Sequence, residues 1–421
     1  MKFRIITLGC KVNTYESNVI RDILLDNNYE EVDECADIYV INTCTVTNTS
    51  DNKSLKEVRR VRRENPNSII IVCGCMSQVR SDIDEIDADI IIGNSGKSDI
   101  INLINEYKEN NKKIIKIDNI MDTKFETMKI NNFNRTRAFV KIEDGCENYC
   151  SYCIIPYARG KVRSKLPNDV LEEVTTLVNG GHKEIVLTGI HTGHYGADLD
   201  GYTFAKLLSE LVKIEGLERI RISSIEMNEL TDEVLEVIKN NPKIVSHLHI
   251  PIQSGSDTIL KLMNRKYLKK EFIDKIEQIR SIRPDINITT DIIVGFPGET
   301  EELFNETLDT VETIHFSKIH VFPFSLRKGT KAEELPNHID DVTKKNRVKI
   351  LIEKSNRLEE EYMSKYIGKE LVFIPEVYRD GCLIGHTGNY LLIKYKGCED
   401  LLHKDVKVKG TIVEYPYLIC E

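Results

Sequence analysis

The stretch AFVKIEDGCENYCSYC, residues 138–153, joins a predicted strand to a C-x3-C-x2-C run. Its first five residues are apolar apart from one lysine, which is typical of a buried strand. The alternation of strand and helix continues from there. The later predicted strands are EIVLT, RIRIS, HLHIP, INITTDIIV and KIHVF, and the predicted helices lie near 168–180, 203–213, 231–240, 256–283 and 300–314. This α/β pattern predicts a curved, partial (β/α)6 barrel with its chemistry at the carboxyl ends of the strands, where the cysteine run begins.

Residues 1–118 show the same alternation in an earlier segment of the chain. The predicted strands are FRIITL, DIYVIN, SIIIVC, ADIIIG and KKIIKI, with helices at 14–27, 51–64, 78–86 and 97–109. This order predicts a parallel α/β sheet domain covered by helices. Cys10, Cys44 and Cys75 each stand just beyond the carboxyl end of one of the first three strands. Because those ends share one edge of a parallel sheet, the three cysteines are expected to converge on one site.

The rest of the chain divides into a connector, a helix and a β-rich tail. Residues 119–134 are expected to be a polar linker, residues 135–366 the barrel domain closed by a long helix at 340–366, and residues 367–421 a small all-β barrel. Small β-barrels often bind nucleic acids, although a shape alone does not establish a function. The tail is nearly neutral, with seven Lys and Arg against eight Asp and Glu.

The composition is that of a globular protein of 421 residues with a net charge of −9. No apolar run approaches the ~20 residues of a membrane span, and the first residues do not form a signal peptide. We therefore expect a cytoplasmic protein with no membrane partner. A nucleic-acid partner would have to be bound by a local basic patch, because the chain as a whole is acidic.

The eleven cysteines indicate metal or redox chemistry, since disulfides are rare in the cytoplasm. Cys146, Cys150 and Cys153 could hold three irons of a four-iron cluster and leave the fourth iron open to a small molecule. Structural zinc is the alternative, but it would require a fourth cysteine or histidine nearby. The remaining cysteines are expected to be small buried side chains, namely Cys35, Cys73, Cys382, Cys398 and Cys420.

At this point a family resemblance becomes clear. The run DGCENYCSYCIIPYARGKVRS, residues 144–164, resembles the radical S-adenosylmethionine signature in the form found in methylthiotransferases. The segments TLGCKVNTYES, INTCTVTN and CGCMSQ resemble the three cluster motifs of the methylthiotransferase amino-terminal domain, and the β tail resembles a TRAM domain. With LTGIHTG, RISSIE and HLHIPIQSGSD, the chain is most similar to the branch that modifies threonylcarbamoyladenosine at position 37 of tRNA. The family pattern Gly-Cys-x-x-Gln selects Cys75 over Cys73.

The resemblance implies two 4Fe-4S clusters and S-adenosylmethionine as cofactors. One cluster, on Cys146, Cys150 and Cys153, would cleave S-adenosylmethionine to a 5′-deoxyadenosyl radical; the other, on the amino-terminal triad, would carry sulfur for transfer to C2 of the adenine. We assign no residue as a general acid or base, because the cofactors carry out the chemistry. The implied partners are tRNA, S-adenosylmethionine, an electron donor of the flavodoxin or ferredoxin type, and a sulfur source.

Polar residues after the barrel strands are candidates for holding S-adenosylmethionine. They are Thr188, Gly189, Ser224, Glu226, Gln253, Ser254 and Gly295, together with Tyr152 between two of the cysteines. The alternative for each is ordinary turn and capping chemistry. Four histidines near strand ends are expected to form hydrogen bonds and not to bind a metal, namely His191, His194, His247 and His249.

Two groups of basic residues are candidates for contacts with RNA phosphates. They are Arg59, Arg60, Arg62 and Arg63 on one predicted helix, and Arg159, Lys161 and Arg163 after the cysteine run. The alternative is a solvated basic helix.

Two further interpretations stay open on the sequence. The first is a methylthiotransferase that acts on isopentenyl-adenosine tRNA or on an aspartate of a ribosomal protein. The second is a non-catalytic iron-sulfur protein that binds RNA.

Overall fold

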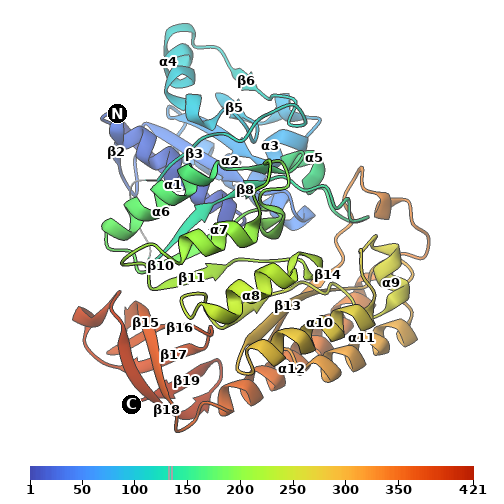
Figure 1. Ribbon diagram of the computed structural model, residues 1–421. Helices are drawn as coiled ribbons and strands as arrows, with labels where there is room; N and C mark the ends of the chain where they lie inside the picture. The colour runs from blue at the N-terminus through green and yellow to red at the C-terminus, as the bar shows by residue number, and fades with distance from the viewer. Residues whose placement is uncertain (131–132, 134–135) are drawn as a thin grey trace.

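The computed structural model describes residues 1–130, 133 and 136–421, and Figure 1 shows an amino-terminal sheet domain, a central barrel and a small carboxyl-terminal barrel. Residues 131, 132 and 134 of the expected linker lie outside the described residues. Among the described residues, no helix is long and apolar enough to cross a membrane.

The amino-terminal domain is a parallel sheet in the order β2-β1-β3-β4-β5-β6, as predicted. Its elements are β1 (Lys2–Thr7), α1 (Lys11–Asp26), β2 (Glu30–Glu31), β3 (Ile38–Thr43), α2 (Asn48–Glu64), β4 (Ile69–Gly74), α3 (Cys75–Val79), β5 (Ile90–Ile92), α4 (Ile100–Asn110) and β6 (Ile114–Lys116). Alternate strand residues pack into two cores on opposite faces, such as Ile71 on one face and Ile70 on the other. The helix predicted at 78–86 is wrong in extent, because only α3 and one 3-10 turn form there.

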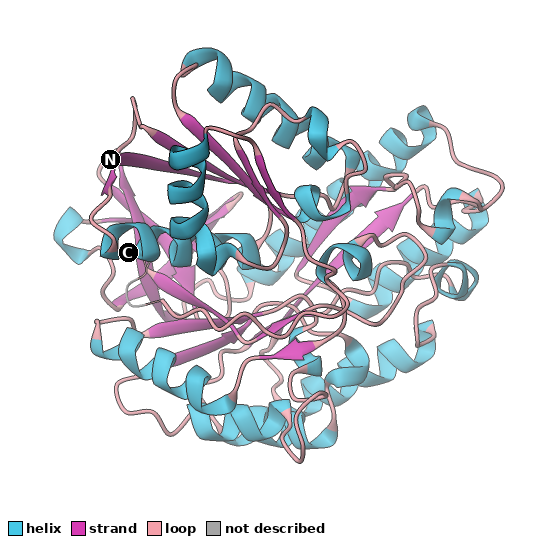
Figure 2. Ribbon diagram, turned by 90° about the horizontal axis from the view of Figure 1, so that it is seen from above, coloured by secondary structure: helices cyan, strands magenta, loops and turns pink. Residues whose placement is uncertain are grey.

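The central domain consists of two parallel three-stranded sheets, β11-β10-β7 and β12-β13-β14, which make the partial barrel. Its strands are β7 (Arg137–Lys141), β8 (Glu143–Asp144), β9 (Arg163–Ser164), β10 (Glu184–Thr188), β11 (Arg219–Ile222), β12 (His247–His249), β13 (Asn287–Val294) and β14 (Lys318–Pro323). Its helices are α5 (Ile155–Arg159), α6 (Pro167–Asn179), α7 (Phe204–Leu211), α8 (Asp232–Asn240), α9 (Asp257–Leu262), α10 (Lys269–Ile282), α11 (Glu301–Ile314) and α12 (Asp341–Ser364). The single helix predicted at 256–283 is therefore two helices. Figure 2 shows the helices arranged around the outside of the strands.

The segment before β7 differs from the expected polar linker. Ile120, Met128 and Ile130 are buried, and the Tyr15 hydroxyl of α1 donates a hydrogen bond to the Met128 carbonyl at 2.8 Å. The backbone N–H of Ile130 donates to the buried carboxylate of Glu173 at 2.8 Å. The described part of this segment therefore belongs to the interface between the two domains.

The carboxyl-terminal domain is a closed barrel in the order β15-β16-β17-β19-β18. Its strands are β15 (Glu370–Arg379), β16 (Cys382–Thr387), β17 (Leu392–Lys396), β18 (Val406–Glu414) and β19 (Tyr417–Cys420). Sequence patterning indicated the barrel but missed β16 and β19. The domain docks at the amino ends of the central strands, where Arg137 pairs with Glu376 at 2.9 Å and Arg219 with Asp405 at 2.6 Å.

Tyr390 is the centre of this docking surface. Its ring stacks between the imidazoles of His247 and His386, with ring centroids 4.7 and 4.5 Å away. The guanidinium groups of Arg137 and Arg221 lie over the same ring at 5.4 and 4.8 Å from its centroid. One side chain from the small barrel is thus held by residues of β7, β11 and β12.

Candidate functional site

The amino-terminal cysteines converge as their positions predicted. β1, β3 and β4 are neighbours in the sheet, and Cys10, Cys44 and Cys75 follow their carboxyl ends. Gly9 allows the close approach, because a Cβ atom there would lie 2.8 Å from the Cys44 Cβ and 3.1 Å from its Sγ. Cys10 is exposed at the edge of the site, but desolvation by the surrounding chain raises its pKa to about 11; Arg159 lowers this pKa, and the neighbouring Cys75 and Cys44 raise it. The three thiols therefore act on one another within a single site.

Arg159 connects this triad to the central domain. The side chain is fully buried, and its Nε donates to the Cys75 sulfur at 3.2 Å. Another guanidinium nitrogen donates to the Asn13 Oδ1 at 2.8 Å, an atom that lies 3.7 Å from the Cys10 sulfur. A buried cation beside the thiols stabilises their deprotonated form, which is the form that binds metal. The expectation that Arg159 contacts RNA is wrong, because its guanidinium is inaccessible to a phosphate.

Glu16 of α1 is the anionic centre of the same network. Its carboxylate pairs with Lys97 at 3.2 Å, Lys141 at 2.8 Å and the Arg159 guanidinium. Burial alone would raise the pKa of Glu16, but these three cations hold it well below its usual range. Asp144 accepts a second hydrogen bond from Lys141 at 2.6 Å. The interface between the two domains is therefore a buried and internally paired charge network.

The two cysteines of the CGC segment occupy different environments. Cys73 is fully buried within β4 in one of the two sheet cores, and burial raises its pKa to about 12. Cys75 begins α3 beyond the strand end, where its sulfur faces Arg159. The geometry thus places Cys75, and not Cys73, beside the other two cysteines.

The cysteine run 146–153 forms a tight loop after β8. Gly145 has φ of +94°, and a Cβ atom there would lie 1.9 Å from the Lys161 carbonyl oxygen, so only glycine fits. The Cys146 N–H donates to the Gly160 carbonyl at 3.0 Å. Asn264 supports the opposite side, since its side-chain amide donates to the Tyr149 carbonyl at 2.9 Å. Segments far apart in the sequence therefore fix the loop's shape.

Arg265 is a site residue that sequence reasoning missed. Its guanidinium donates to the Cys150 sulfur at 3.4 Å and to the Tyr267 hydroxyl at 2.8 Å, and it also pairs with Glu226. Glu226, which was predicted to bind S-adenosylmethionine, therefore also positions a cation beside a cysteine. Each cysteine triad thus has one buried arginine whose N–H points at a sulfur, Arg159 for the first and Arg265 for the second.

Two buried polar atoms near this loop have no partner among the described residues. They are Oε1 of Glu143 and Nδ1 of His191. The other Glu143 oxygen accepts the His191 backbone N–H at 2.7 Å, and burial raises the pKa of Glu143 well above its usual range. Buried polar groups normally have a partner, so these atoms suit a polar ligand such as the amino acid part of S-adenosylmethionine.

A cavity of about 490 Å³ opens beside Cys150. His191, His194, Glu226 and Arg265 line it together with Asn148, whose side-chain amide lies 3.2 Å from the His191 Nε2. Its polar wall and its contact with one of the cysteines make it the candidate ligand pocket. The volume is in the range of small-molecule sites.

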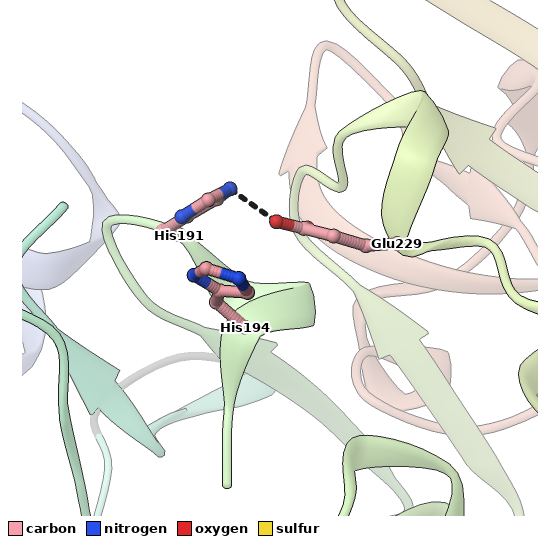
Figure 3. A group of neighbouring side chains, drawn as sticks. All are labelled: His191, His194 and Glu229. Carbon is pink, nitrogen blue, oxygen red and sulfur yellow. Dashed lines mark ion pairs between the residues drawn. The ribbon is translucent and has the colours of Figure 1, made fainter. Parts of the chain in front are cut away.

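Figure 3 shows that His191 Nε2 faces a carboxylate oxygen of Glu229, with His194 beside the pair. The two imidazole centroids are 4.5 Å apart. His247 and His249 both form hydrogen bonds with the Thr289 hydroxyl, at 3.1 and 2.9 Å. The prediction that these histidines form hydrogen bonds is therefore confirmed for His247 and His249.

The other predicted cofactor residues fall into two groups. Gly189 adjoins the orphaned carboxyl, since a Cβ atom there would lie 2.7 Å from Glu143 Oε2, and Tyr152 packs edge-on against Phe296 at 6.3 Å. Others have local backbone roles: the Ser254 hydroxyl accepts the Ser256 N–H at 3.2 Å, and the Gly295 N–H donates to Glu299 at 2.6 Å. Thr188 is buried at the end of β10, while Ser224 and Gln253 are half-buried after β11 and β12.

The spacing of the sulfur atoms separates a cluster from zinc. A tetrahedral zinc site has Zn–S bonds of about 2.3 Å, which place its sulfur atoms about 3.8 Å apart. Among the described residues, neither cysteine triad has all three Sγ atoms within 4.8 Å of one another. This arrangement of the thiols is wider than that of a tetrahedral zinc site and is compatible with a multi-iron cluster.

The predicted RNA contacts on α2 differ in their availability. Arg62 pairs with Asp89 at 2.7 Å and Asp87 at 3.1 Å, and Arg60 pairs with Glu57 and Glu64. In contrast, Arg59 and Arg63 are exposed. They line a groove of about 520 Å³ with Asn52, Leu55, Lys56 and Arg60.

The basic residues after the cysteine run also differ from one another. Lys161 is exposed. Arg163 is buried and donates to the Arg159 carbonyl at 2.7 Å and to Thr123. Its expected role in RNA binding is wrong, because the guanidinium holds the interdomain segment in place.

Comparisons with known proteins agree with this geometry. A model described as the radical SAM superfamily matches residues 140–311, and one described as "Uncharacterized protein family UPF0004" matches residues 2–93. The threonylcarbamoyladenosine tRNA methylthiotransferase MtaB of Bacillus subtilis (strain 168) is 47% identical over 98% of this chain and 94% of its own length. The MtaB protein of Aquifex aeolicus (strain VF5) is 38% identical over 95% and 98%.

Relatives named for another substrate are also found. The tRNA-2-methylthio-N(6)-dimethylallyladenosine synthase of Thermoanaerobacter pseudethanolicus (strain ATCC 33223 / 39E) is 39% identical over 97% of this chain and 90% of its own length. Among solved structures, the radical S-adenosylmethionine methyltransferase TsrM from Kitasatospora setae has a TM-score of 0.58 at 12% identity, covering 79% of this chain and 76% of that one. This last likeness shows the fold alone.

Proposed function

This chain belongs to the family of radical SAM tRNA methylthiotransferases, and on that premise we propose that it adds a methylthio group to C2 of N6-threonylcarbamoyladenosine at position 37 of tRNA. It is a radical SAM enzyme that modifies tRNA and uses 4Fe-4S clusters with S-adenosylmethionine. The substrate follows the relatives named for threonylcarbamoyladenosine, of which the first is 47% identical over nearly the whole chain.

Two sets of residues would hold the clusters: Cys146, Cys150 and Cys153 in the barrel, and Cys10, Cys44 and Cys75 in the amino-terminal domain. When bound, the first cluster would supply the one-electron reduction that radical S-adenosylmethionine chemistry requires, and the second would supply the sulfur. The spaced thiols and the arginine beside each triad support this assignment.

The polar residues of the cavity bind and orient the amino acid part of S-adenosylmethionine. The unpaired Glu143 oxygen suits its ammonium group, and Arg265, held by Glu226, suits its carboxylate. The buried surroundings of these residues limit the access of water, which protects a reactive species from side reactions.

The observation that carries this proposal is the direct connection between the two triads. Arg159 follows Cys153 by one short helix, and its guanidinium reaches Cys75 in the other domain. A residue of the segment that follows the barrel's cysteine loop therefore donates a hydrogen bond to Cys75, one of the proposed cluster ligands of the amino-terminal triad. This arrangement suits an enzyme that generates a radical at one centre and delivers sulfur from the other.

RNA contacts are proposed on the exposed cations Lys56, Arg59, Arg63 and Lys161, and on the TRAM-like barrel 367–421. The reaction would take place in the cytoplasm, with a flavodoxin- or ferredoxin-type electron donor and a separate sulfur source. The exposed basic groove on α2 supports the first part, because phosphates bind cations that are open to solvent.

Cysteine variants test the division of labour. Replacing Cys146, Cys150 or Cys153 with Ala should abolish 5′-deoxyadenosine and methylthio-tRNA together. Replacing Cys10, Cys44 or Cys75 should abolish methylthio-tRNA while 5′-deoxyadenosine still forms. Cys73→Ala is the matched control and should retain both products, measured by chromatography with mass spectrometry. Methylthio-tRNA from a Cys10, Cys44 or Cys75 variant would disprove the assignment.

The substrate is tested by mass spectrometry of tRNA nucleosides from cells with and without the protein. We expect 2-methylthio-N6-threonylcarbamoyladenosine to disappear when the protein is absent. Loss of the methylthio-dimethylallyl nucleoside instead would favour dimethylallyladenosine, the substrate in the name of the relative from Thermoanaerobacter pseudethanolicus. An unchanged set of nucleosides with a modified ribosomal-protein aspartate would rule out a tRNA substrate.

A further inference from the structure

Lys11 is a cation at the edge of the amino-terminal cysteine site. It is the first residue of α1, directly after Cys10, and its side chain is half-buried. Within the described part of the chain, its ammonium group has no hydrogen bond or ion pair, whereas the nearby buried Lys97 and Lys141 both pair with Glu16. A desolvated cation is costly unless an anion approaches it.

The charged groups around Lys11 do not supply that anion. Arg221 and Arg137 are the strongest charged influences on it, followed by Cys10 and Asp291. Both arginines already use carboxylates of their own, since Arg221 pairs with Glu184 at 2.8 Å and Arg137 with Glu376 at 2.9 Å. Asp291 faces His249, with 3.3 Å between the imidazole nitrogen and the carboxylate oxygen. The surroundings of Lys11 therefore favour an anion from outside the chain.

The position of Lys11 also matches the chemistry of the proposed substrate. Cys10 belongs to the triad proposed to deliver sulfur to C2 of the adenine, so the C2 edge of the base must approach this residue. In N6-threonylcarbamoyladenosine, the urea N–H next to the threonine can donate to N1, which folds the substituent toward the C2 edge. The threonyl carboxylate then lies on the side of the base that faces Cys10 and Lys11.

We propose that Lys11 pairs with the threonyl carboxylate of the target nucleoside and thereby selects substrates whose N6 substituent carries a negative charge. This inference rests on the proposed function and extends it from the reaction to the basis of its specificity. An apolar N6 substituent would displace water from the half-buried Lys11 side chain without giving its ammonium group a partner, so the same residue that attracts one nucleoside rejects the other.

Binding to three matched RNAs tests the inference. The RNAs are anticodon stem-loops of one sequence that carry threonylcarbamoyladenosine, its neutral carboxamide analogue, or unmodified adenosine at the target position. Dissociation constants are measured by fluorescence anisotropy with the anaerobically reconstituted protein. We expect the wild type to bind the acid about tenfold more tightly than the amide, as a charge-assisted hydrogen bond would give.

Variants of Lys11 separate charge from shape. Lys11→Gln should bind acid and amide equally, and Lys11→Arg should keep the preference for the acid. Lys56→Gln, an exposed lysine of the α2 groove, is the control and should weaken binding of all three RNAs by the same factor. Iron content and far-ultraviolet circular dichroism establish that each variant is folded and contains its clusters. If Lys11→Gln is not folded or lacks iron, Lys11→Met takes its place in the binding experiment.

The outcomes distinguish this inference from the proposed function. An acid preference that survives in Lys11→Gln overturns the role of Lys11, as does a wild type that binds acid and amide equally while still methylthiolating threonylcarbamoyladenosine. A wild type that does not methylthiolate threonylcarbamoyladenosine at all overturns the proposed function itself.

Discussion

The buried guanidinium of Arg159 contacts several polar groups at the interface between the two domains. Its guanidinium touches the Cys75 sulfur, the Asn13 amide oxygen and the carboxylates of Glu16 and Asp144. We predict that Arg159→Met lowers the free energy of unfolding by about 3–5 kcal/mol, because it breaks the buried ion pairs of Arg159 with Glu16 and Asp144. Denaturant unfolding of the apoprotein, followed in the amino-terminal domain, measures the effect.

The double variant Arg159→Met with Glu16→Gln provides the control. Without Arg159, Glu16→Gln breaks the ion pairs with Lys97 and Lys141 alone, so it should cost less stability than in the wild type and the two effects should not add. If Glu16→Gln lowers the free energy of unfolding by the same amount in Arg159→Met as in the wild type, the two residues contribute to stability independently.

Gly145 gives a second prediction at the scale of one residue. Gly145→Ala should prevent the cysteine loop from closing, because the new Cβ would overlap the Lys161 carbonyl oxygen. Iron per chain should then fall from about eight to about four after reconstitution. Gly181→Ala is the matched control: its φ is +100°, but no atom lies within 4 Å of the new Cβ, so iron content should not change. Full iron loading of Gly145→Ala would contradict the proposed loop geometry.

At the scale of elements, α2 offers a comparison between the exposed cations Arg59 and Arg63 and two cations held in shorter ion pairs, Arg60 and Arg62; Arg63 has a longer contact of 3.5 Å with Glu64. Replacing Arg59 and Arg63 with Gln should reduce the salt dependence of tRNA binding by about one unit of slope per residue. Replacing Arg60 and Arg62 with Gln should change it much less, because both are paired with carboxylates of the protein. Equal effects of the two double variants in filter-binding titrations would show that the ion pairs open when RNA binds.

Most elements were predictable because the strand-helix alternation is strong, and the misses have physical causes. β16 (CLIGHT) and β19 (YLIC) pair with neighbouring strands of the chain, but they are six and four residues long and so contain too few residues for a clear apolar alternation. The break between α9 and α10 lies at Asn264, a residue with positive φ whose side chain supports the cysteine loop. Local apolar periodicity contains no information about such long-range demands.

The absence of long-range information in local sequence patterns also explains which site residues could be predicted. The cysteines were predictable because their spacing is local or follows strand ends. Arg265, Glu143 and Lys11 were not predicted from the sequence. Their proposed roles depend on the contacts that each side chain has or lacks in the folded protein, and the sequence alone does not give these contacts. Arg159 and Arg163 were assigned to RNA from charge density alone, which cannot distinguish a surface cation from a buried one.

At the scale of the molecule, Tyr390 holds the carboxyl-terminal barrel against the central domain. Tyr390→Ala should weaken this docking by about 2–3 kcal/mol, through lost ring packing and two lost cation–π contacts. Limited proteolysis should then cleave the connection between α12 and β15 faster and release the small barrel. Tyr378→Ala, an exposed tyrosine on β15, is the control and should leave the cleavage rate unchanged.

The placement of the small barrel limits the length of RNA that the protein can engage. The barrel docks at the amino ends of the central strands, whereas the cysteine loop lies beyond their carboxyl ends. β13 has eight residues, so at about 3.3 Å per residue these ends are about 26 Å apart. An RNA must therefore extend along the full height of the central barrel to contact both the small barrel and the cysteine loop. Progressively shortened stem-loops should lose affinity in one step when they no longer reach the small barrel.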